Sequence, residues 1–423
     1  MIPALAALLS LIILGVPVAV ALGITAIGFL AVGVVPFNIV SAQMFSGLSN
    51  FVFLAMPMFM IAGEVMNRAG IADDLIEFVS SIVGWVRGGL GMANIGVSMV
   101  FAEISGSATA DVASLGTILI PQMEKRGYPK AFAAAITSSS ASIAIIIPPS
   151  IPLIIYGALA EESVIKLFIA GIIPGAFLGI CLMAFTYVFA LRNGWPADRK
   201  FEFMRLLKGF RRAIWALTLP VIILGGILGG IFTPTEAAAV AVAAALFIGL
   251  FITRKISLFD MPSIILVAAK RTSIVLLLVS TSAVFGWYLT NEGIPQQIAE
   301  QVMAISDNRY VLMFLINIML IVLGMFLHGV AGLILVVPLA MPLVTQLGYD
   351  PIHFGIIIAL NLCIGQQTPP VASVLFAAAS VSGCKLGEIF VYNKWFILCI
   401  FLVLNIVTYV PELSLWLPSA LID

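Results

Sequence analysis

Long apolar runs alternate with short polar connections along all 423 residues of the chain. The hydrocarbon core of a bilayer, about 30 Å thick, needs roughly 20 apolar residues in one helix. Runs of this kind lie near 3–33, 51–67, 131–158, 166–191, 213–232, 236–253, 272–290, 353–379 and 395–417. The pattern predicts an all-α integral membrane protein in which each of these runs crosses the bilayer once.

Two further apolar stretches, at about 88–124 and 310–346, are too long for a single crossing. Gly106 and His328 lie near their midpoints, and small polar residues surround Gly106. Non-helical backbone at membrane depth is tolerated only where protein buries it or where it lines a cavity. We therefore expect two re-entrant hairpins, each entering and leaving on one side, with tips that meet near the membrane centre.

The composition excludes several classes of protein. Hydrophobic residues make up 62% of the chain and charged residues only 9%, whereas about 25% of a typical soluble domain is charged. The 20 basic residues cancel the 20 acidic ones, so the chain lacks the excess positive charge that nucleic acid attracts. The four cysteines have no metal-ligand spacing, and no Ser-His-Asp order or HExxH motif is present. Neither a zinc site nor an enzyme is expected.

Basic residues gather on one side of the predicted topology. With the N-terminus inside the cell, every Lys and Arg except Lys166 and Arg309 falls on the inner side, as the positive-inside rule requires. The same scheme places the C-terminus outside. Segment 192–212 combines aromatic with basic residues and is predicted to form an amphipathic arm along the cytoplasmic surface.

The two halves of the chain share an internal repeat. Pro121, Gly127, Tyr128, Pro148 and Pro149 recur 221 residues later as Pro342, Gly348, Tyr349, Pro369 and Pro370. The first copy covers roughly 51–158 and the second 272–380; we refer to them as copy one and copy two. An odd number of predicted crossings separates them, so copy two is inverted. Inverted repeats are typical of secondary transporters, which bind substrate and coupling ion at the midplane between the copies.

Paired prolines break one predicted helix in each copy. Proline lacks an N–H group, so Pro148 and Pro149 are expected to release the carbonyls of Ala144 and Ile145. Pro369 and Pro370 are expected to release those of Gly365 and Gln366 in the same way. A hard cation would satisfy such carbonyls, together with the hydroxyls of Ser140, Ser142, Ser150 and Thr368. The alternative is a pair of proline kinks capped by Ser and Thr.

Charged residues inside the first hairpin are candidates for function. Placing the charges of Glu103 and Asp111 inside the membrane costs free energy, so both residues are candidates for function. Asp111 is equally suited to stabilise the N-terminus of the second half of the hairpin. His328 is either a proton-titrating group or a packing residue. The run Ser138–Ser140 is expected to be a contact between small residues on neighbouring helices.

Several segments carry a resemblance to a known family. They read EISGSATADVASLGTILIPQMEKRGYPKAFAAAITSSSA, IIPPSIPLIIYGAL, FTPTEAAAVAVAAAL, LGMFLHGVAGLILVVPLAMPLV and IGQQTPPVASVLF. In this order they resemble the large membrane (M) subunit of tripartite ATP-independent periplasmic (TRAP) transporters, of the DctM-like type. The resemblance covers essentially the whole chain.

The resemblance implies a sodium-driven importer with an elevator movement, fed by a periplasmic substrate-binding protein and accompanied by a small four-helix membrane subunit. It implies one sodium site at Ser105, Ala144, Ile147 and Pro149, and a second at Gly324, Gly365, Thr368 and Val371. The substrate would meet the hairpin and broken-helix tips at Ser105, Ser107, Asp111, Ser150 and His328. The family usually has an acidic or amide residue at the position of His328.

These observations, together with what the resemblance implies, predict an inverted-repeat transporter of the elevator type in the bacterial inner membrane, with a cytoplasmic N-terminus and a periplasmic C-terminus. The expected units are an N-terminal scaffold helix with its connector (1–50), repeat one of the transport domain (51–165), scaffold helices with the arm (166–271), repeat two (272–385) and a C-terminal scaffold helix (386–423). The expected function is sodium-coupled import of a small organic acid, such as sialic acid or a C4-dicarboxylate. The alternatives are a proton-coupled carboxylate transporter that needs no binding protein, an ion channel and an intramembrane enzyme.

Overall fold

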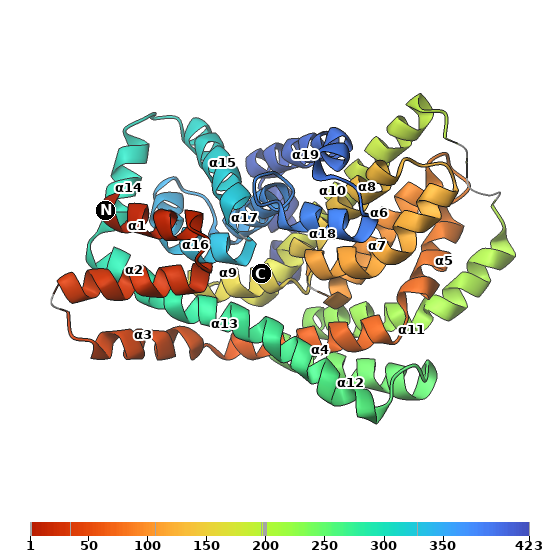
Figure 1. The fold of residues 1–423 in the computed structure, drawn as a ribbon, viewed down its shortest axis with the longest axis horizontal. Helices are drawn as coiled ribbons and strands as arrows, with labels where there is room; N and C mark the ends of the chain where they lie inside the picture. The colour runs from red at the N-terminus through yellow and green to blue at the C-terminus, as the bar shows by residue number, and fades with distance from the viewer. Residues whose placement is uncertain are drawn as a thin grey trace.

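A computed structural model describes residues 2–33, 35–105, 107–195, 197, 201–327 and 329–422, without the side chains of residues 2, 5 and 102–105. Within these ranges helices joined by short connections make up the chain, and the one β-type pairing is an isolated bridge between Arg87 and Ala197. The predicted all-α class is confirmed. Figure 1 shows the helices as an elongated assembly in which the two halves of the chain interpenetrate.

The N-terminal region forms α1 (Ile2–Ile13), α2 (Val18–Val32), α3 (Asn38–Leu48), the 3₁₀ helix η1 (Phe51–Leu54) and α4 (Ala55–Arg68). The prediction of one continuous helix at 3–33 is wrong. Gly15 has a φ of +84° and Pro17 precedes α2, so the helix ends and restarts there. The predicted run at 51–67 is confirmed as η1 followed directly by α4.

Copy one continues with a short helix, a hairpin and a broken helix. Its elements are α5 (Ala72–Val83), the hairpin helices α6 (Gly89–Ser105) and α7 (Ala108–Lys125), and then α8 (Lys130–Ala141), η2 (Ser142–Ile145) and α9 (Ile151–Ala160). The hairpin lies where 88–124 was predicted to turn back, and the break lies at the paired prolines.

The middle of the chain forms α10 (Val164–Arg192), α11 (Phe203–Leu228), α12 (Pro234–Phe247), the π-helical turn η3 (Ile248–Ile252), η4 (Leu258–Asp260) and α13 (Met261–Asn291). The prediction of a separate amphipathic helix at 192–212 is wrong. Residues from Phe203 onward belong to α11, which continues without interruption into the apolar segment predicted at 213–232. Basic and apolar residues are compatible with one continuous helix because both are good helix formers.

Copy two repeats the order of copy one. It begins within α13, as copy one begins with η1 and α4, and continues with α14 (Ile294–Met303), the hairpin helices α15 (Arg309–Phe326) and α16 (Gly329–Gln346), and the broken helix α17 (Pro351–Gly365) and α18 (Ser373–Ser382). The chain ends with α19 (Leu386–Tyr409) and α20 (Glu412–Leu421). The last crossing, predicted at 395–417, therefore begins earlier, at Leu386, and stops before Pro411.

Eight helical segments of the described chain are long and apolar enough to cross a membrane. They include α15 and α16, each of 18 residues, whereas both broken helices are built from shorter apolar pieces. Length alone therefore does not reveal the broken helices. The paired prolines divide each of them near its middle, so that neither piece reaches the length of a membrane span.

The two copies interlock instead of standing side by side. Helix α9 of copy one packs on α16 of copy two, and α18 of copy two packs on α7 and α8. Helices α10 and α19 also pack on this core, through contacts of α10 with α6 and α17 and of α19 with α8 and α17. These two helices, which the sequence analysis assigns to the scaffold, thus contact both repeats.

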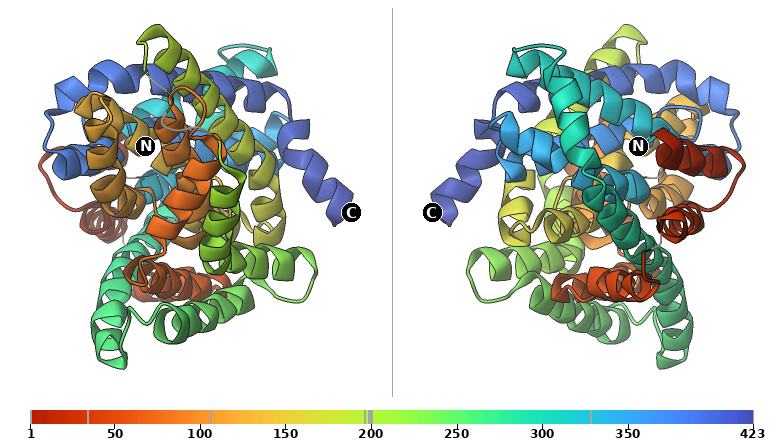
Figure 2. Two further views of the ribbon diagram at one scale, coloured as in Figure 1. Left: turned by 90° about the vertical axis from the view of Figure 1, so that its right-hand side faces the viewer. Right: turned by 90° about the vertical axis from the view of Figure 1, so that its left-hand side faces the viewer.

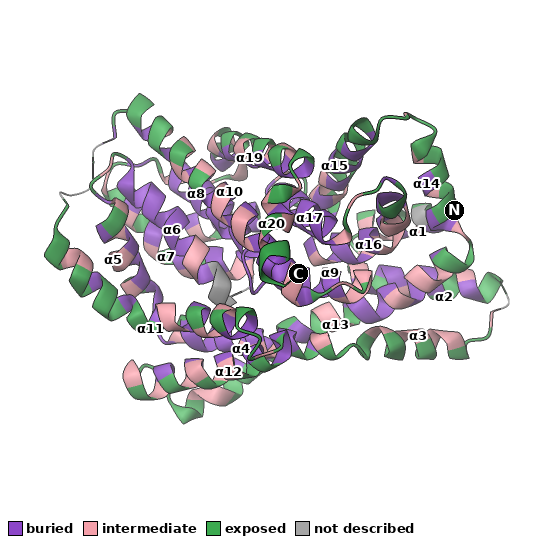
Figure 3. Cartoon of the chain, turned by 180° about the vertical axis from the view of Figure 1, so that it is seen from behind, coloured by how far each residue is buried: buried purple, intermediate pink, exposed green. Residues whose placement is uncertain are grey.

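Helices α2 to α5 and α11 to α13 form an outer layer against this core. Helices α2 and α3 pack on α13, α4 packs on α12 and α13, and α5 packs on α11. Figures 1 and 2 show α3, α4, α12 and α13 gathered along one edge of the molecule. In Figure 3, α6 and α8 are largely buried while α3, α11 and α12 have exposed faces. The exposed side chains of these outer helices include large apolar ones such as Phe45, Val221 and Phe247, as expected of a surface that faces lipid.

Glycines with positive φ mark equivalent turns in both copies. Gly127 and Gly348 have φ values of +85° and +72° where each hairpin connects to its broken helix. An added Cβ at either position would meet no atom within 4 Å. The requirement for glycine is therefore conformational, since L-residues rarely adopt this region of φ/ψ space.

We expect Gly348→Ala to lower the stability of the protein by about 1 kcal/mol, because alanine at this φ is strained. Gly28→Ala is the matched control: Gly28 is also exposed with no atom near its Cβ position, but it lies inside α2. The control should be neutral or slightly stabilising. Thermal unfolding of both purified variants measures the difference, and equal melting temperatures would contradict the conformational argument.

Candidate functional site

A cavity of about 320 Å³ lies where both copies meet the outer layer. The hairpin of copy one contributes Ser107 to Ala110, and the broken helix of copy one contributes Ile145, Ile151 and Pro152. Copy two contributes Val330 and Gln366, and α4 and α13 complete the wall. Among its polar lining residues are Glu64, Asn67, Ser107, Thr109, Arg271 and Gln366. The cavity is therefore bounded on one side by the interlocked core and on the other by the outer helices.

Three helices direct their N-termini at this cavity. Helix α7 begins at Ala108, α9 at Ile151 and α16 at Gly329, and Ala108, Ile151 and the second residue of α16, Val330, line the wall. The first N–H groups of a helix have no partner within the helix, and the helix dipole places a partial positive charge there. The site is therefore suited to an anion.

Ser150 caps the second half of the first broken helix. Its hydroxyl accepts a hydrogen bond from Leu153 N at 3.4 Å and donates one to the carbonyl oxygen of Ile145 at 2.5 Å. The side chain is fully buried, and its neighbours Ile151 and Pro152 line the cavity. The expectation that the proline pair leaves the Ile145 carbonyl unpaired is therefore wrong, because the capping hydroxyl reaches back across the break.

The carbonyls at the second break also have partners. The Gly365 carbonyl accepts a hydrogen bond from Thr368 N at 3.1 Å, and the Gln366 carbonyl accepts one from Val374 N at 3.1 Å. The expectation that these two carbonyls are unpaired is wrong, because the chain folds back after the prolines and supplies N–H groups from further along. A carbonyl oxygen has two lone pairs, so each can still face a cation.

The structure brings together the four residues expected at the second sodium site. Gly324 of α15 and Gly365 of α17 are in direct backbone contact, so close that a Cβ on Gly365 would lie 2.7 Å from Gly324 Cα. Val371 N donates to the carbonyl of Met325 at 3.1 Å, which ties the break to the tip of the hairpin. The Thr368 hydroxyl donates to the Ile364 carbonyl at 2.8 Å, so its oxygen keeps lone pairs for another partner.

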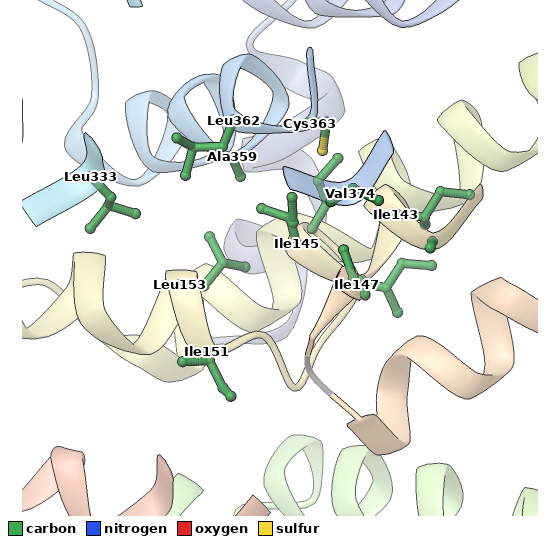
Figure 4. Packing of buried hydrophobic residues seen from close by; sticks show 14 of the residues in the cluster. Ile143, Ile145, Ile147, Ile151, Leu153, Leu333, Ala359, Leu362, Cys363 and Val374 are labelled. Carbon is green, nitrogen blue, oxygen red and sulfur yellow. The ribbon is translucent and has the colours of Figure 1, made fainter. Parts of the chain in front are cut away.

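The residues expected at the first sodium site are only partly described. Ala144 and Ile147 are buried in the first break, while the side chain of Ser105 lies outside the described part of the chain. Figure 4 shows the apolar side chains around this break, with Ile145 and Leu153 beside Ala359 and Leu362 of α17. Pro149 follows Ile147 along the same backbone segment. Apolar side chains thus pack around the first break.

Two glycines of α10 approach the first break, and sequence reasoning missed both. A Cβ at Gly171 would collide with the carbonyl oxygen of Ile146, and one at Gly175 would lie 2.5 Å from the Ile147 side chain. They stand four residues apart on one face of α10, a spacing that marks close helix packing in membranes. That spacing was the available signal.

The residues expected to meet substrate fall into three groups. Ser107 lines the cavity, with its Oγ 3.3 Å from Oγ1 of Thr109, a lining residue that the sequence did not single out. Asp111 is buried in the first turn of α7, where a carboxylate is favoured by the helix dipole. Ser150 acts as a cap, as described above. His328 and the side chain of Ser105 lie outside the described residues.

A buried polar network joins the two breaks. The Ser139 hydroxyl lies 2.8 Å from Oε1 of Gln367 and 3.0 Å from Oδ1 of Asn393. Gln367 Nε2 in turn donates to the Ser142 hydroxyl at 2.9 Å, and Asn393 Nδ2 donates to the Gln367 carbonyl at 3.3 Å. Ser139 is therefore a hydrogen-bonding residue between the copies and more than a small-residue contact. Gln367 and Asn393 were missed, although an amide within an apolar run was visible in the sequence.

Comparison with known proteins gives a consistent family. The family model described as "Tripartite ATP-independent periplasmic transporter, DctM component" matches residues 5–413. The sialic acid TRAP transporter large permease protein SiaM of Vibrio cholerae is 38% identical, with 97% of this chain and 96% of that protein covered. The C4-dicarboxylate TRAP transporter large permease protein DctM of Rhodobacter capsulatus is 33% identical, with 98% of each covered.

Two further similarities differ in extent. The isethionate TRAP transporter permease protein DctMQ of Oleidesulfovibrio alaskensis is 38% identical over 96% of this chain, which spans 64% of that longer protein. The crystal structure of the YdaH transporter of Alcanivorax borkumensis has a TM-score of 0.63 at 14% identity, with 90% of this chain and 87% of that chain covered. At this identity the second likeness concerns the fold alone.

We expect Gly365→Ala to destabilise the protein by about 1–3 kcal/mol, because the added methyl group would overpack the backbone contact with Gly324. Gly332→Ala is the matched control in copy two: its Cβ would meet Leu327 at 3.6 Å, an ordinary contact. Melting temperatures of the two purified variants measure the difference. If both variants behave like wild type, the two backbones do not pack as closely as described.

Proposed function

The chain belongs to the family of DctM components of TRAP transporters, and from this premise we propose that it imports a small organic anion together with sodium. Its relatives are transporter permeases, so the protein is a multi-pass membrane transporter and not an enzyme. The substrate, the coupling ion and the partners are the proposed parts of this function.

The convergence of three helix N-termini on one cavity carries the proposal of an anionic substrate. The N-termini of α7, α9 and α16 each carry a partial positive charge, and together they would stabilise the negative charge of a carboxylate or sulfonate. The relatives are named for isethionate, C4-dicarboxylate and sialic acid, which are all organic acids. A small organic acid with a carboxylate or sulfonate group is therefore the substrate class that we propose for this cavity.

The oxygen-rich breaks support sodium as the coupling ion. At the second break, backbone carbonyls and the Thr368 hydroxyl surround the Gly324–Gly365 contact. Hard cations prefer such neutral oxygen ligands, and unwound backbone in transporters commonly provides them. We assign the first site, at Ala144, Ile147 and Pro149 with Ser105, by the repeat symmetry.

The position of the cavity supports an elevator movement. It lies between the interlocked core, formed by both hairpins and both broken helices with α10 and α19, and the outer helices α4 and α13. A ligand at this boundary would be exposed on one side or the other when the core slides against the outer layer. The core in this proposal is larger than the two repeats alone, because α10 and α19 pack on it.

The proposed partners are a periplasmic substrate-binding protein and a small four-helix membrane subunit. The exposed apolar faces of α3, α11 and α12 offer room for a membrane partner as well as for lipid. The proposed location is the bacterial inner membrane. The concentration of Lys and Arg in the loops on one side of the protein supports a cytoplasmic N-terminus and a periplasmic C-terminus.

We expect uptake to require sodium. The complete transporter with its binding protein is reconstituted in proteoliposomes, and uptake of isethionate, succinate and N-acetylneuraminate is measured with an imposed sodium gradient. At least one of them should accumulate with sodium and none with a proton gradient alone, because neutral oxygen ligands at the breaks suit sodium. Full uptake driven by protons without sodium would support the proton-coupled alternative instead.

We expect Thr368→Ala to raise the sodium concentration for half-maximal uptake by about fivefold, the loss of one neutral ligand being worth about 1 kcal/mol. Thr368→Ser keeps the hydroxyl and should stay near wild type. If Thr368 only caps the break through the Ile364 carbonyl, the alanine variant will instead melt at a lower temperature at every sodium concentration while its half-maximal concentration stays unchanged.

A further inference from the structure

Three charged residues form a cluster on the outer wall of the cavity. Glu64 and Arg68 lie on α4, and Arg271 lies on α13. The Glu64 side chain is only 10% exposed, whereas the side chains of Arg68 and Arg271 are 33% and 47% exposed. Glu64 and Arg271 both line the cavity. A buried carboxylate thus stands between two guanidinium groups beside the site proposed for the substrate.

The two arginines are held by Glu64 unequally. Arg68 Nε donates to Glu64 Oε1 at 2.9 Å, and Arg68 Nη1 also donates to the Ser263 hydroxyl at 2.5 Å. Arg271 Nη1 lies 3.6 Å from Glu64 Oε2, beyond hydrogen-bond distance, and within the described chain its guanidinium makes no hydrogen bond. Arg68 therefore neutralises Glu64, and Arg271 leaves the cluster with a net charge of +1.

The position of Arg271 gives this surplus charge a direction. Among the described residues that line the cavity, Arg271 is the one cationic side chain. It shares the cavity with Ser107 and with the N-termini of α9 and α16, so the positive ends of two helices without an acidic residue in their first turn act on one volume with a full positive charge. The neighbouring Lys270 is exposed and does not line the cavity.

We propose that Arg271 binds the acid group of the transported anion on the outer-helix side of the cavity, with its guanidinium donors left free because Glu64 is hydrogen-bonded to Arg68 instead. The planar guanidinium fits a carboxylate or a sulfonate through two parallel hydrogen bonds. Because α13 belongs to the outer layer, this contact is made only when the core brings the hairpin tip opposite Arg271. The role as an anion anchor for transport rests on the proposed function; the binding of an anion there does not.

The test measures anion binding by the purified full chain, independently of transport. Melting temperature is recorded against the concentration of isethionate, succinate and N-acetylneuraminate at fixed sodium. At least one anion should stabilise wild type. In Arg271→Gln the concentration of that anion needed for half of the stabilisation should rise about tenfold, the effect of losing one charged hydrogen-bond partner. Lys270→Gln removes the same charge from the adjacent residue and should keep the wild-type value.

Glu64→Gln separates an anchor from a structural ion pair. If Arg271 binds the anion, loss of the competing carboxylate should leave binding equal or tighter, which is the opposite sign to Arg271→Gln. If the cluster only ties α4 to α13 and thereby holds the cavity in shape, both Arg271→Gln and Glu64→Gln should weaken anion binding. This variant also decides the outcome should Arg271→Gln fail to fold.

Three results would overturn the proposal: no stabilisation of wild type by any of the three anions, an unchanged half-effective concentration in Arg271→Gln, or weaker binding in Glu64→Gln. Failure of sodium-driven uptake, with binding that still depends on Arg271, would refute the proposed function and leave the anion site standing.

Discussion

The constraint on which this structure depends is that a backbone polar group inside a bilayer must find a partner in the protein. Each unsatisfied N–H or carbonyl in hydrocarbon costs several kcal/mol. The paired prolines remove N–H groups at the middle of two helices, and other donors replace them at three of the four carbonyls. The Ser150 hydroxyl serves the Ile145 carbonyl, while Val374 N and Thr368 N serve carbonyls of the second break. The breaks are therefore stable only because residues further along the chain supply hydrogen-bond donors to their carbonyls.

The same constraint explains why the copies interlock. A broken helix exposes backbone that neighbouring helices must cover closely, and glycine permits the closest approach. Gly365 of α17 contacts Gly324 of α15, and Gly171 of α10 approaches the carbonyl of Ile146. The network of Ser139, Gln367 and Asn393 then joins the two breaks through buried hydrogen bonds. Such a network stabilises one arrangement of the core, because any relative shift of the copies would leave several buried groups without partners.

The boundary between the core and the outer layer has a different character. The hairpin of copy one meets α4 through a hydrogen bond from the Ser114 hydroxyl to Asn67 Oδ1, at 2.6 Å and exposed. The cavity opens beside this contact and is lined by Glu64 and Arg271. A boundary held by a small number of exposed polar contacts opens more easily than a core held by a buried hydrogen-bond network. The elevator movement proposed above would need this difference, since its core must move as one body while the contacts at the boundary break and form again.

The sequence by itself determined the features that depend on short segments. Hydropathy over about 20 residues placed most of the helices, and the recurrence of Pro148–Pro149 as Pro369–Pro370 revealed the repeat and both breaks. It failed locally at 3–33, which divides at Gly15, and at 192–212, which is not a separate helix. It also failed where the folded chain supplies a partner: the carbonyls of Ile145, Gly365 and Gln366 accept hydrogen bonds at the breaks. Only the tertiary structure brought Glu64 and Arg271 together across some 200 residues, or linked Ser139 to Gln367. Hydrogen-bond and ion-pair partners are set by distances that exist only after packing, whereas the tendency to enter the bilayer is a property of each segment alone.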